Sequence, residues 1–142
     1  MTTVQQLLDE KGHEVWSADP DDTVFDTIQK MASKDVGALV VMEDDKPVGI
    51  FTERHYAREV ILKGKSSPKT PVRDVMTTSV ICARPEQKVE ECMAVMTEKR
   101  VRHLPVLHNK QLVGIISIGD LVKSIIADQK FTIEQLEHYI HG

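Results

Sequence analysis

The sequence has little of what builds disulfide frameworks or membrane spans. Its two cysteines, Cys82 and Cys92, form neither a CxxC motif nor a disulfide framework. The longest apolar runs, such as ALVVM and VGIIS, are far too short to cross a bilayer. The polar start MTTVQQLLDEKG lacks the basic-then-apolar pattern of a signal peptide. We therefore expect a cytoplasmic protein without a membrane partner.

Other absences limit the possible functions. The net charge is −4 and no long basic stretch is present, so nucleic-acid binding is not expected. GKSS at positions 64–67 resembles the end of a P-loop motif, but Glu59 occupies the position where that motif requires glycine. His138 and His141 lie one helical turn apart, and we interpret them as a solvated helix face rather than a metal site. Without a nucleophile–base pair or a metal cluster, we expect no catalysis.

What the sequence does contain is an internal repeat. Shifted by 65 residues, the sequence aligns with itself without a gap. The shared residues are mostly apolar or structural, so they indicate a repeated fold rather than a repeated reactive group. Val15, Ala18, Pro20, Val24, Met31, Lys34, Val36, Leu39, Val41, Val48, Gly49, Ile50 and Ile61 fall on Val80, Ala83, Pro85, Val89, Met96, Lys99, Val101, Leu104, Val106, Val113, Gly114, Ile115 and Ile126.

Each copy predicts the order strand, helix, strand, strand, helix. The strands are EVWSA, ALVVM and VGIFT in the first copy and SVICA, HLPVL and VGIIS in the second, with an amphipathic helix after each first strand. Such a unit has too little core to stand alone, so we expect one α/β (α+β) module with pseudo-two-fold symmetry. We assign residues 13–62 to repeat 1, 63–77 to a linker, 78–127 to repeat 2 and 128–142 to a C-terminal helix. A short helix is expected at QQLLDEKG near the N-terminus.

The strand–helix junction of the second copy could bind a ligand. Ser117 lies at the expected N-cap and Asp120 three residues later, where a hydroxyl and free N–H groups favour phosphate and a carboxylate can accept from a ribose diol. Gly119 would allow close approach to the backbone. The alternative is helix capping alone, because Ser-x-x-Asp is nearly a capping box. The first copy has Thr52 and His55 there, and a histidine cannot replace a carboxylate that accepts from a diol.

These residues carry a family resemblance. The repeat, with VRHLPVL before LVGIISIGDLVKSII, resembles the tandem cystathionine-β-synthase (CBS) domain pair, or Bateman module, over about residues 13–127. The TEKRVRHLPVL and SIGDLVK motifs and the tail FTIEQLEHYIHG are similar to those of stand-alone bacterial CBS-pair proteins. The resemblance implies a homodimeric, non-catalytic sensor that binds an adenine nucleotide in clefts between its repeats and signals to an unidentified protein. AMP and NAD(H) are the first choices, and ATP, ADP and S-adenosylmethionine are the others.

The resemblance also implies site residues. Gly114, Ile115, Ser117 and Asp120 match the family's ligand motif, so Asp120 should hold the ribose hydroxyls and Ser117 the phosphate. The residues expected to complete this cleft are Asp19, Val36, Gly37, Ala38 and Arg102.

A second cleft would use Thr52 with Arg84, Val101, Arg102 and His103, but it departs from the motif at His55. We therefore predict one strong nucleotide site and one that is weak, empty or repurposed. Arg54 and Arg58 could reach a second phosphate, which favours NAD over AMP alone, or they could be solvated helix residues.

Two rival hypotheses stay open. The chain could be a dimerisation scaffold in which Ser117 and Asp120 only cap a helix. It could also be an enzyme such as a nucleotide hydrolase, which the absence of an activated nucleophile disfavours.

Overall fold

The computed structural model describes residues 1–141, with side chains described as far as Ile140. Its contacts divide the chain into two compact units. Unit 1 comprises residues 1–13, 82–108 and 113–142, and unit 2 comprises residues 14–81 and 109–112. The mixed α/β class expected from the repeat is confirmed. No helix in the described part of the chain combines the length and the apolar character needed to span a bilayer.

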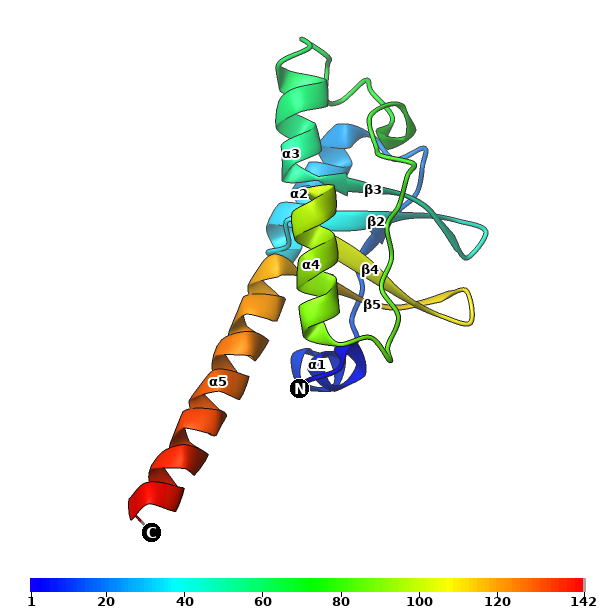
Figure 1. Cartoon of the computed structure of the whole chain (residues 1–142). Coiled ribbons are helices and arrows are strands. Elements are labelled where there is room, and N and C mark those ends of the chain that lie inside the picture. Colours follow the sequence, from blue (N-terminus) through cyan, green and yellow to red (C-terminus); the bar gives the residue numbers. More distant parts are fainter. Residues whose placement is uncertain (142) are drawn as a thin grey trace. The chain divides into compact units, whose positions relative to one another are not determined.

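Unit 2 is built on a three-stranded sheet of order β1-β2-β3 (Figure 1). The strands are β1 (Ser17–Ala18), β2 (Ala38–Glu43) and β3 (Lys46–Thr52), with β1–β2 parallel and β2–β3 antiparallel. Its helices are α2 (Val24–Lys34), α3 (Glu53–His55), the π-helical η1 (Tyr56–Ile61) and the 3-10 helix η2 (Val72–Asp74). Val24 and Met31 of α2 are buried in one cluster with Leu39, Val41 and Phe51, so the predicted amphipathic face of α2 packs on the sheet.

Unit 1 repeats this plan with a shorter sheet. It contains α1 (Val4–Lys11), α4 (Val89–Lys99), β4 (His103–His108) paired with β5 (Gln111–Ser117), of which residues 113–117 belong to unit 1, and α5 (Ile118–His141). The predicted N-terminal helix is thus confirmed as α1, which begins at a capping box made by Thr3 and Gln6.

The repeat is visible in the backbone as well as in the apolar residues. Helices α2 and α4 both end at a left-handed residue, Asp35 and Arg100. Both hairpins turn through two consecutive residues with positive φ, 44–45 and 109–110. Two consecutive residues of positive φ are typical of the tight turns that match the twist of a hairpin. The residue types at these paired positions differ, so this conformational match could not be read from identities.

The first strand of each copy is shorter than predicted. EVWSA contributes only β1 (Ser17–Ala18), and SVICA contributes a single parallel bridge from Ala83 to Val106. In the bridge, Ala83 N–H donates to Pro105 O at 2.8 Å and Leu107 N–H donates to Ala83 O at 2.9 Å. The following turns, which begin at Pro20 and Pro85, end the pairing at once, because proline provides no N–H for a ladder.

The segment 63–77, predicted as a linker, packs as part of unit 2. Val72 and Val75 are buried in the core cluster of that unit. Backbone hydrogen bonds fix its ends, from Val24 N–H to Thr70 O at 2.8 Å and between Ile50 and Thr77 in both directions at 3.0 Å. Because the segment is mostly polar and contains prolines, its composition did not predict that these two valines are buried.

The C-terminal segment also differs from its predicted boundary. Residues 128–141 do not form a separate helix, because α5 runs without a break from Ile118 to His141. Every residue from 129 to 140 is exposed, and in Figure 1 the red end of α5 extends beyond α1 and α4 of the same unit.

The paired glycines Gly49 and Gly114 are required by close packing. A Cβ at Gly49 would lie 2.5 Å from Met76 Sδ and 2.9 Å from Thr77 O. A Cβ at Gly114 would lie 2.6 Å from Cδ2 of the buried Leu8. These contacts explain why both copies keep glycine in the middle of the last strand.

We predict that Gly49→Ala lowers the free energy of unfolding by roughly 1–3 kcal/mol, since the methyl group must displace the Met76 side chain and the backbone at Thr77. The matched control is Gly119→Ala, where the nearest atom to the added Cβ is Ser117 Oγ at 3.6 Å. Alanine at this helical position should be neutral or stabilising by up to about 1 kcal/mol. Urea unfolding of the three proteins measures both effects, and equal stability of Gly49→Ala and the parent chain would contradict the packing argument.

Candidate functional site

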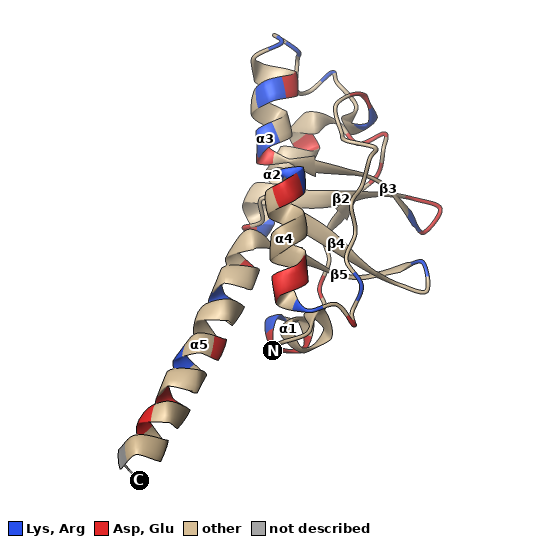
Figure 2. Ribbon diagram, in the orientation of Figure 1, with Lys and Arg blue, Asp and Glu red and all other residues tan. Residues whose placement is uncertain are grey.

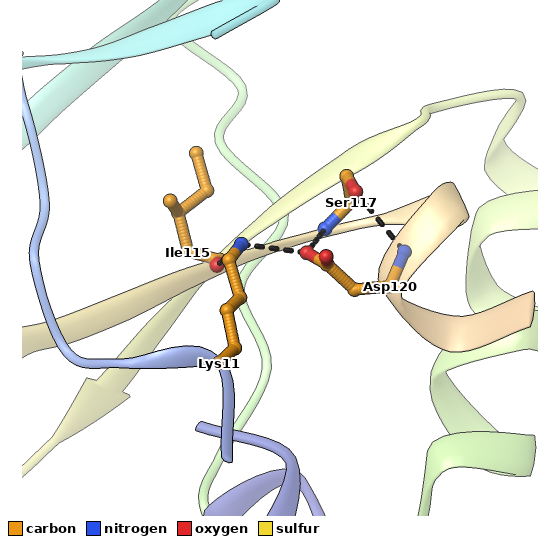
Figure 3. Close-up of polar contacts among 4 residues, drawn as sticks. All are labelled: Lys11, Ile115, Ser117 and Asp120. Atoms are coloured by element: carbon orange, nitrogen blue, oxygen red, sulfur yellow. Dashed lines mark hydrogen bonds and ion pairs between the residues drawn. The ribbon is translucent and has the colours of Figure 1, made fainter. Parts of the chain in front are cut away.

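The junction between β5 and α5 brings Ser117 and Asp120 together by reciprocal hydrogen bonds (Figure 3). Ser117 N–H donates to Asp120 Oδ2 at 2.8 Å, and Asp120 N–H donates to Ser117 Oγ at 3.2 Å. This is the capping arrangement that the sequence offered as an alternative to ligand binding. The two functions can coexist, because the capping bond to the carboxylate uses Oδ2 and no described residue donates to Oδ1.

Lys11 is a third member of this site that sequence reasoning missed. Its ammonium group lies 2.6 Å from Asp120 Oδ2 and 2.6 Å from Ile115 O (Figure 3). Lys11 ends α1, more than a hundred residues before its partner. A basic residue in the last turn of a helix has an ordinary local explanation in the helix dipole. No local signal therefore pointed to Asp120.

The Asp120 carboxyl is held in its charged form. Burial alone would raise its pKa, but the hydrogen bonds from Lys11 and from Ser117 outweigh burial, so the net pKa is lowered. The side chain is 21% exposed and Lys11 is 33% exposed. The junction thus presents an ionised carboxylate that solvent and a ligand can still reach.

Two more predicted residues lie beside this junction. Ile118 N–H donates to Arg102 O at 2.9 Å, which ties the start of β4 to the start of α5. Burial lowers the pKa of His103, Lys11 and Arg102 lower it further, and Asp120 opposes them. His103 is therefore close enough to Asp120 to sense its charge, and the structure brings Arg102, His103, Ser117, Gly119 and Asp120 into one region of unit 1.

A cavity of about 250 Å³ opens on the α1–α5 side of Asp120. Small-molecule sites in proteins are usually about 300–1,000 Å³. A cavity of this size can hold part of a nucleotide rather than all of it. Its lining combines apolar residues with polar residues of both charges: Thr2, Leu7, Glu10, Lys11, Asp120, Lys123, Ser124, Ala127 and Asp128.

The equivalent junction of unit 2 reproduces the hydrogen bonds with a different residue. Thr52 N–H donates to Nδ1 of His55 at 3.0 Å, and His55 N–H donates to Thr52 Oγ1 at 3.2 Å. Nδ1 of His55 therefore takes the place of a carboxylate oxygen as the acceptor. The ring also stacks on Phe51, with centroids 6.1 Å apart. Capping is conserved between the copies, whereas the negative charge is not.

The predicted site residues of unit 2 lie around the Thr52 junction and in the turn after β1, whereas Arg84 and Val101 belong to unit 1. Glu53 N–H donates to Gly37 O at 3.1 Å and Ala38 pairs with Thr52 across the sheet, so Val36, Gly37, Ala38 and Thr52 are neighbours. Arg54 and Arg58 are exposed on the helices that follow Thr52, and both lower the pKa of His55. Asp19 lies in the turn after β1, where its carboxylate accepts from Asp21 N–H at 2.9 Å. Their roles toward a ligand stay predictions.

The metal alternative at His138 and His141 falls partly beyond the described part of the chain, which does not include the side chain of His141. Among the side chains that are described, no three His, Cys, Asp or Glu residues gather closely enough to hold a metal ion.

Comparison with known proteins decides the family. The model of the CBS domain matches residues 11–61 and 72–127. The chain belongs to the CBS domain family. Its two copies are thus a CBS domain pair, and the predicted resemblance is confirmed.

Solved and curated CBS proteins agree with this assignment. A protein of Burkholderia ambifaria described as a signal-transduction protein with CBS domains is 50% identical, with a TM-score of 0.86 over 90% of this chain and 96% of that one. The CBS domain-containing protein CBSX3 of Arabidopsis thaliana, named as mitochondrial, is 38% identical over 99% of this chain and 73% of its own length.

One solved relative contains adenosine compounds. It is a CBS domain pair in complex with 5′-methylthioadenosine and S-adenosyl-L-methionine, 19% identical, with a TM-score of 0.79 over 90% of this chain and 98% of that one. At this identity the comparison shows the common fold alone.

The His55 junction predicts a pH dependence of stability. Burial is the main cause that lowers the pKa of His55, with Arg54 and Arg58 acting the same way and Glu59 opposing them. The unfolded chain therefore takes up a proton at a higher pH than the folded chain. Stability should fall as the pH drops below about 6.5, the ordinary histidine value, until the lower folded pKa is passed.

The measurement is the urea midpoint between pH 7.5 and 5.5 for the parent chain and for His55→Asn. Asparagine can still accept from Thr52 N–H but does not titrate, so its midpoint should fall less on acidification. His103 contributes a loss of the same sign in both proteins. Identical pH profiles would show that His55 is not the group responsible.

Proposed function

We propose that this CBS domain pair is a non-catalytic regulatory module that binds an adenosine nucleotide at the Ser117–Asp120 junction. The observation that carries the proposal is the Asp120 carboxylate, which is ionised, partly exposed and beside a cavity. A carboxylate has about four acceptor positions, and the two hydrogen bonds it accepts here leave Oδ1 available to a ribose diol.

The ligand class follows from chemistry and from the relatives. A CBS domain pair of the same fold binds methylthioadenosine and S-adenosylmethionine, both of which contain a ribose diol. We propose AMP or NAD(H) first, with ADP, ATP and S-adenosylmethionine as the other candidates. Because His55 lacks a carboxylate, we propose one strong site per chain.

Binding would regulate by shifting a conformational population. A ligand changes such an equilibrium only as far as its affinities for the two states differ. The change would then be transmitted to a protein partner that remains to be identified. We also propose a cytoplasmic location, because the two cysteines are free, as a reducing compartment requires.

We predict that Asp120→Asn abolishes nucleotide binding while the chain stays folded. Asparagine can still accept from Ser117 N–H, but the charge and one acceptor oxygen are lost. The matched control is Glu134→Gln, an exposed carboxylate further along α5 that does not line the cavity. Isothermal titration with AMP and NAD should give about one site per chain for the parent and for Glu134→Gln, and no measurable heat for Asp120→Asn.

The same titrations separate this function from the rivals. If the parent protein, first stripped of carried-over nucleotide, binds none of the candidates, the Ser117–Asp120 pair serves capping alone. Equal affinity in Asp120→Asn would place the site elsewhere. Turnover of ATP or NAD with added magnesium would support the enzyme hypothesis instead.

A second candidate function is self-assembly through α5. Large apolar side chains are exposed along its last turns, and Figure 2 shows charged residues of both signs spaced along the same helix. Contiguous exposed apolar surface is typical of interaction sites. The exposed residues are Ile126, Phe131, Ile133, Leu136, Tyr139 and Ile140. We propose a homodimer to which this surface contributes.

We predict that Leu136→Glu weakens the dimer by about tenfold or more, because a charge would replace a leucine in an apolar interface. The control is Gln135→Glu, which adds the same charge one residue away. Sedimentation equilibrium of the three proteins measures the association constant. A monomeric parent chain, or equal association in Leu136→Glu, would remove α5 from the assembly.

A further inference from the structure

Lys11 occupies one of the two Asp120 carboxylate oxygens that a bound ribose could use. Asp120 Oδ2 already accepts from Ser117 N–H at 2.8 Å and from the Lys11 ammonium at 2.6 Å. A carboxylate oxygen offers about two acceptor positions, so Oδ2 is saturated. Oδ1 stays open to the diol, but a diol that places one hydroxyl on each oxygen needs Lys11 to move away.

Lys11 is able to move. Its side chain is 33% exposed, and a lysine has a flexible four-carbon stem. Moving it breaks two contacts of 2.6 Å, to Asp120 Oδ2 and to Ile115 O. The ammonium then needs a new partner close to the junction, because its charge was balanced by the Asp120 carboxylate.

The ligand itself can provide that partner only if it is anionic. A phosphate joined to the bound ribose would accept the displaced ammonium and restore an ion pair. An uncharged nucleoside would break the Lys11–Asp120 pair without replacing it. A sulfonium ligand would add a second positive charge next to Lys11.

We infer that Lys11 makes the Ser117–Asp120 junction select phosphorylated adenosine ligands over uncharged or cationic ones. The inference rests on the proposed function and adds the residue that discriminates between ligands. It sets this chain apart from the CBS domain pair solved with methylthioadenosine and S-adenosylmethionine, neither of which carries a phosphate.

The other charged groups around the cavity do not replace Lys11 in this role. Lys123 lines the same cavity, but no hydrogen bond or ion pair joins it to Asp120. Glu10 and Asp128 also line it and carry the opposite charge. Lys11 is thus the cation that must respond when a ligand takes the Asp120 carboxylate.

The test compares the affinities of AMP, adenosine, methylthioadenosine and S-adenosylmethionine in isothermal titrations. The parent chain should bind AMP most tightly. In Lys11→Met, AMP should bind more weakly and adenosine more tightly, because the phosphate loses its cation while Asp120 is unmasked. The ratio of the adenosine and AMP dissociation constants should therefore fall by about tenfold.

Four comparisons guard against a merely structural effect. Lys130→Met removes a positive charge from an exposed position of α5 outside the cavity and should leave the ratio unchanged. Lys11→Arg retains the charge and should retain the preference for AMP, and Lys11→Gln provides a second neutral variant if Lys11→Met folds poorly. In the parent chain, raising the salt concentration should weaken AMP binding more than adenosine binding.

The possible failures are distinguishable. If the parent chain binds AMP and adenosine through Asp120, but the ratio is the same in Lys11→Met and Lys11→Gln, the inference is wrong and the proposed function stands. If the parent chain binds no adenosine compound, both are wrong. If adenosine binds more tightly than AMP in the parent chain, Lys11 does not select for phosphate.

Discussion

The reciprocal hydrogen bonds at the two strand–helix junctions fix how each copy of the repeat is built. At each junction the backbone N–H of the last strand residue donates to the side chain of the residue three positions later. The backbone N–H of that later residue donates to the hydroxyl oxygen of the last strand residue. The bonds satisfy donors that an uncapped helix start leaves unpaired. They also fix the direction in which the side chain of the third residue points, and this side chain is the one proposed to meet a ligand.

Capping requires only a hydrogen-bond acceptor on the third residue, and either a histidine ring or a carboxylate can provide it. The neutral ring nitrogen Nδ1 of His55 accepts from Thr52 N–H, just as Oδ2 of Asp120 accepts from Ser117 N–H. Only the carboxylate has a second oxygen and a negative charge. That difference lets the copies keep the same backbone while only one has the groups that a ribose diol needs. Without a ligand, the ion pair with Lys11 stabilises the charged form of the Asp120 carboxylate.

Much of the fold could be predicted because it depends on local patterns. The spacing of Val24 and Met31 predicts the buried face of α2, and the 65-residue offset predicts its counterpart α4. The Ser117–Asp120 junction could be predicted for the same reason, since its partners are three residues apart. The residues that were misjudged depend on distant contacts, such as Val72 and Val75, which anchor a segment that reads as a linker. The short first strands also depend on how few residues reach the neighbouring strand.

Residue types and their short-range spacing are enough to predict the repeat, the order of elements, the CBS family and the absence of a carboxylate at His55. The three-dimensional packing was needed to show that Lys11 contacts Asp120, that α5 continues unbroken past residue 128 and that a cavity opens beside the junction. An ion pair between residues more than a hundred positions apart depends on how α1 packs beside β5 and α5. No pattern along the chain records that packing, because either residue alone has a sufficient local explanation.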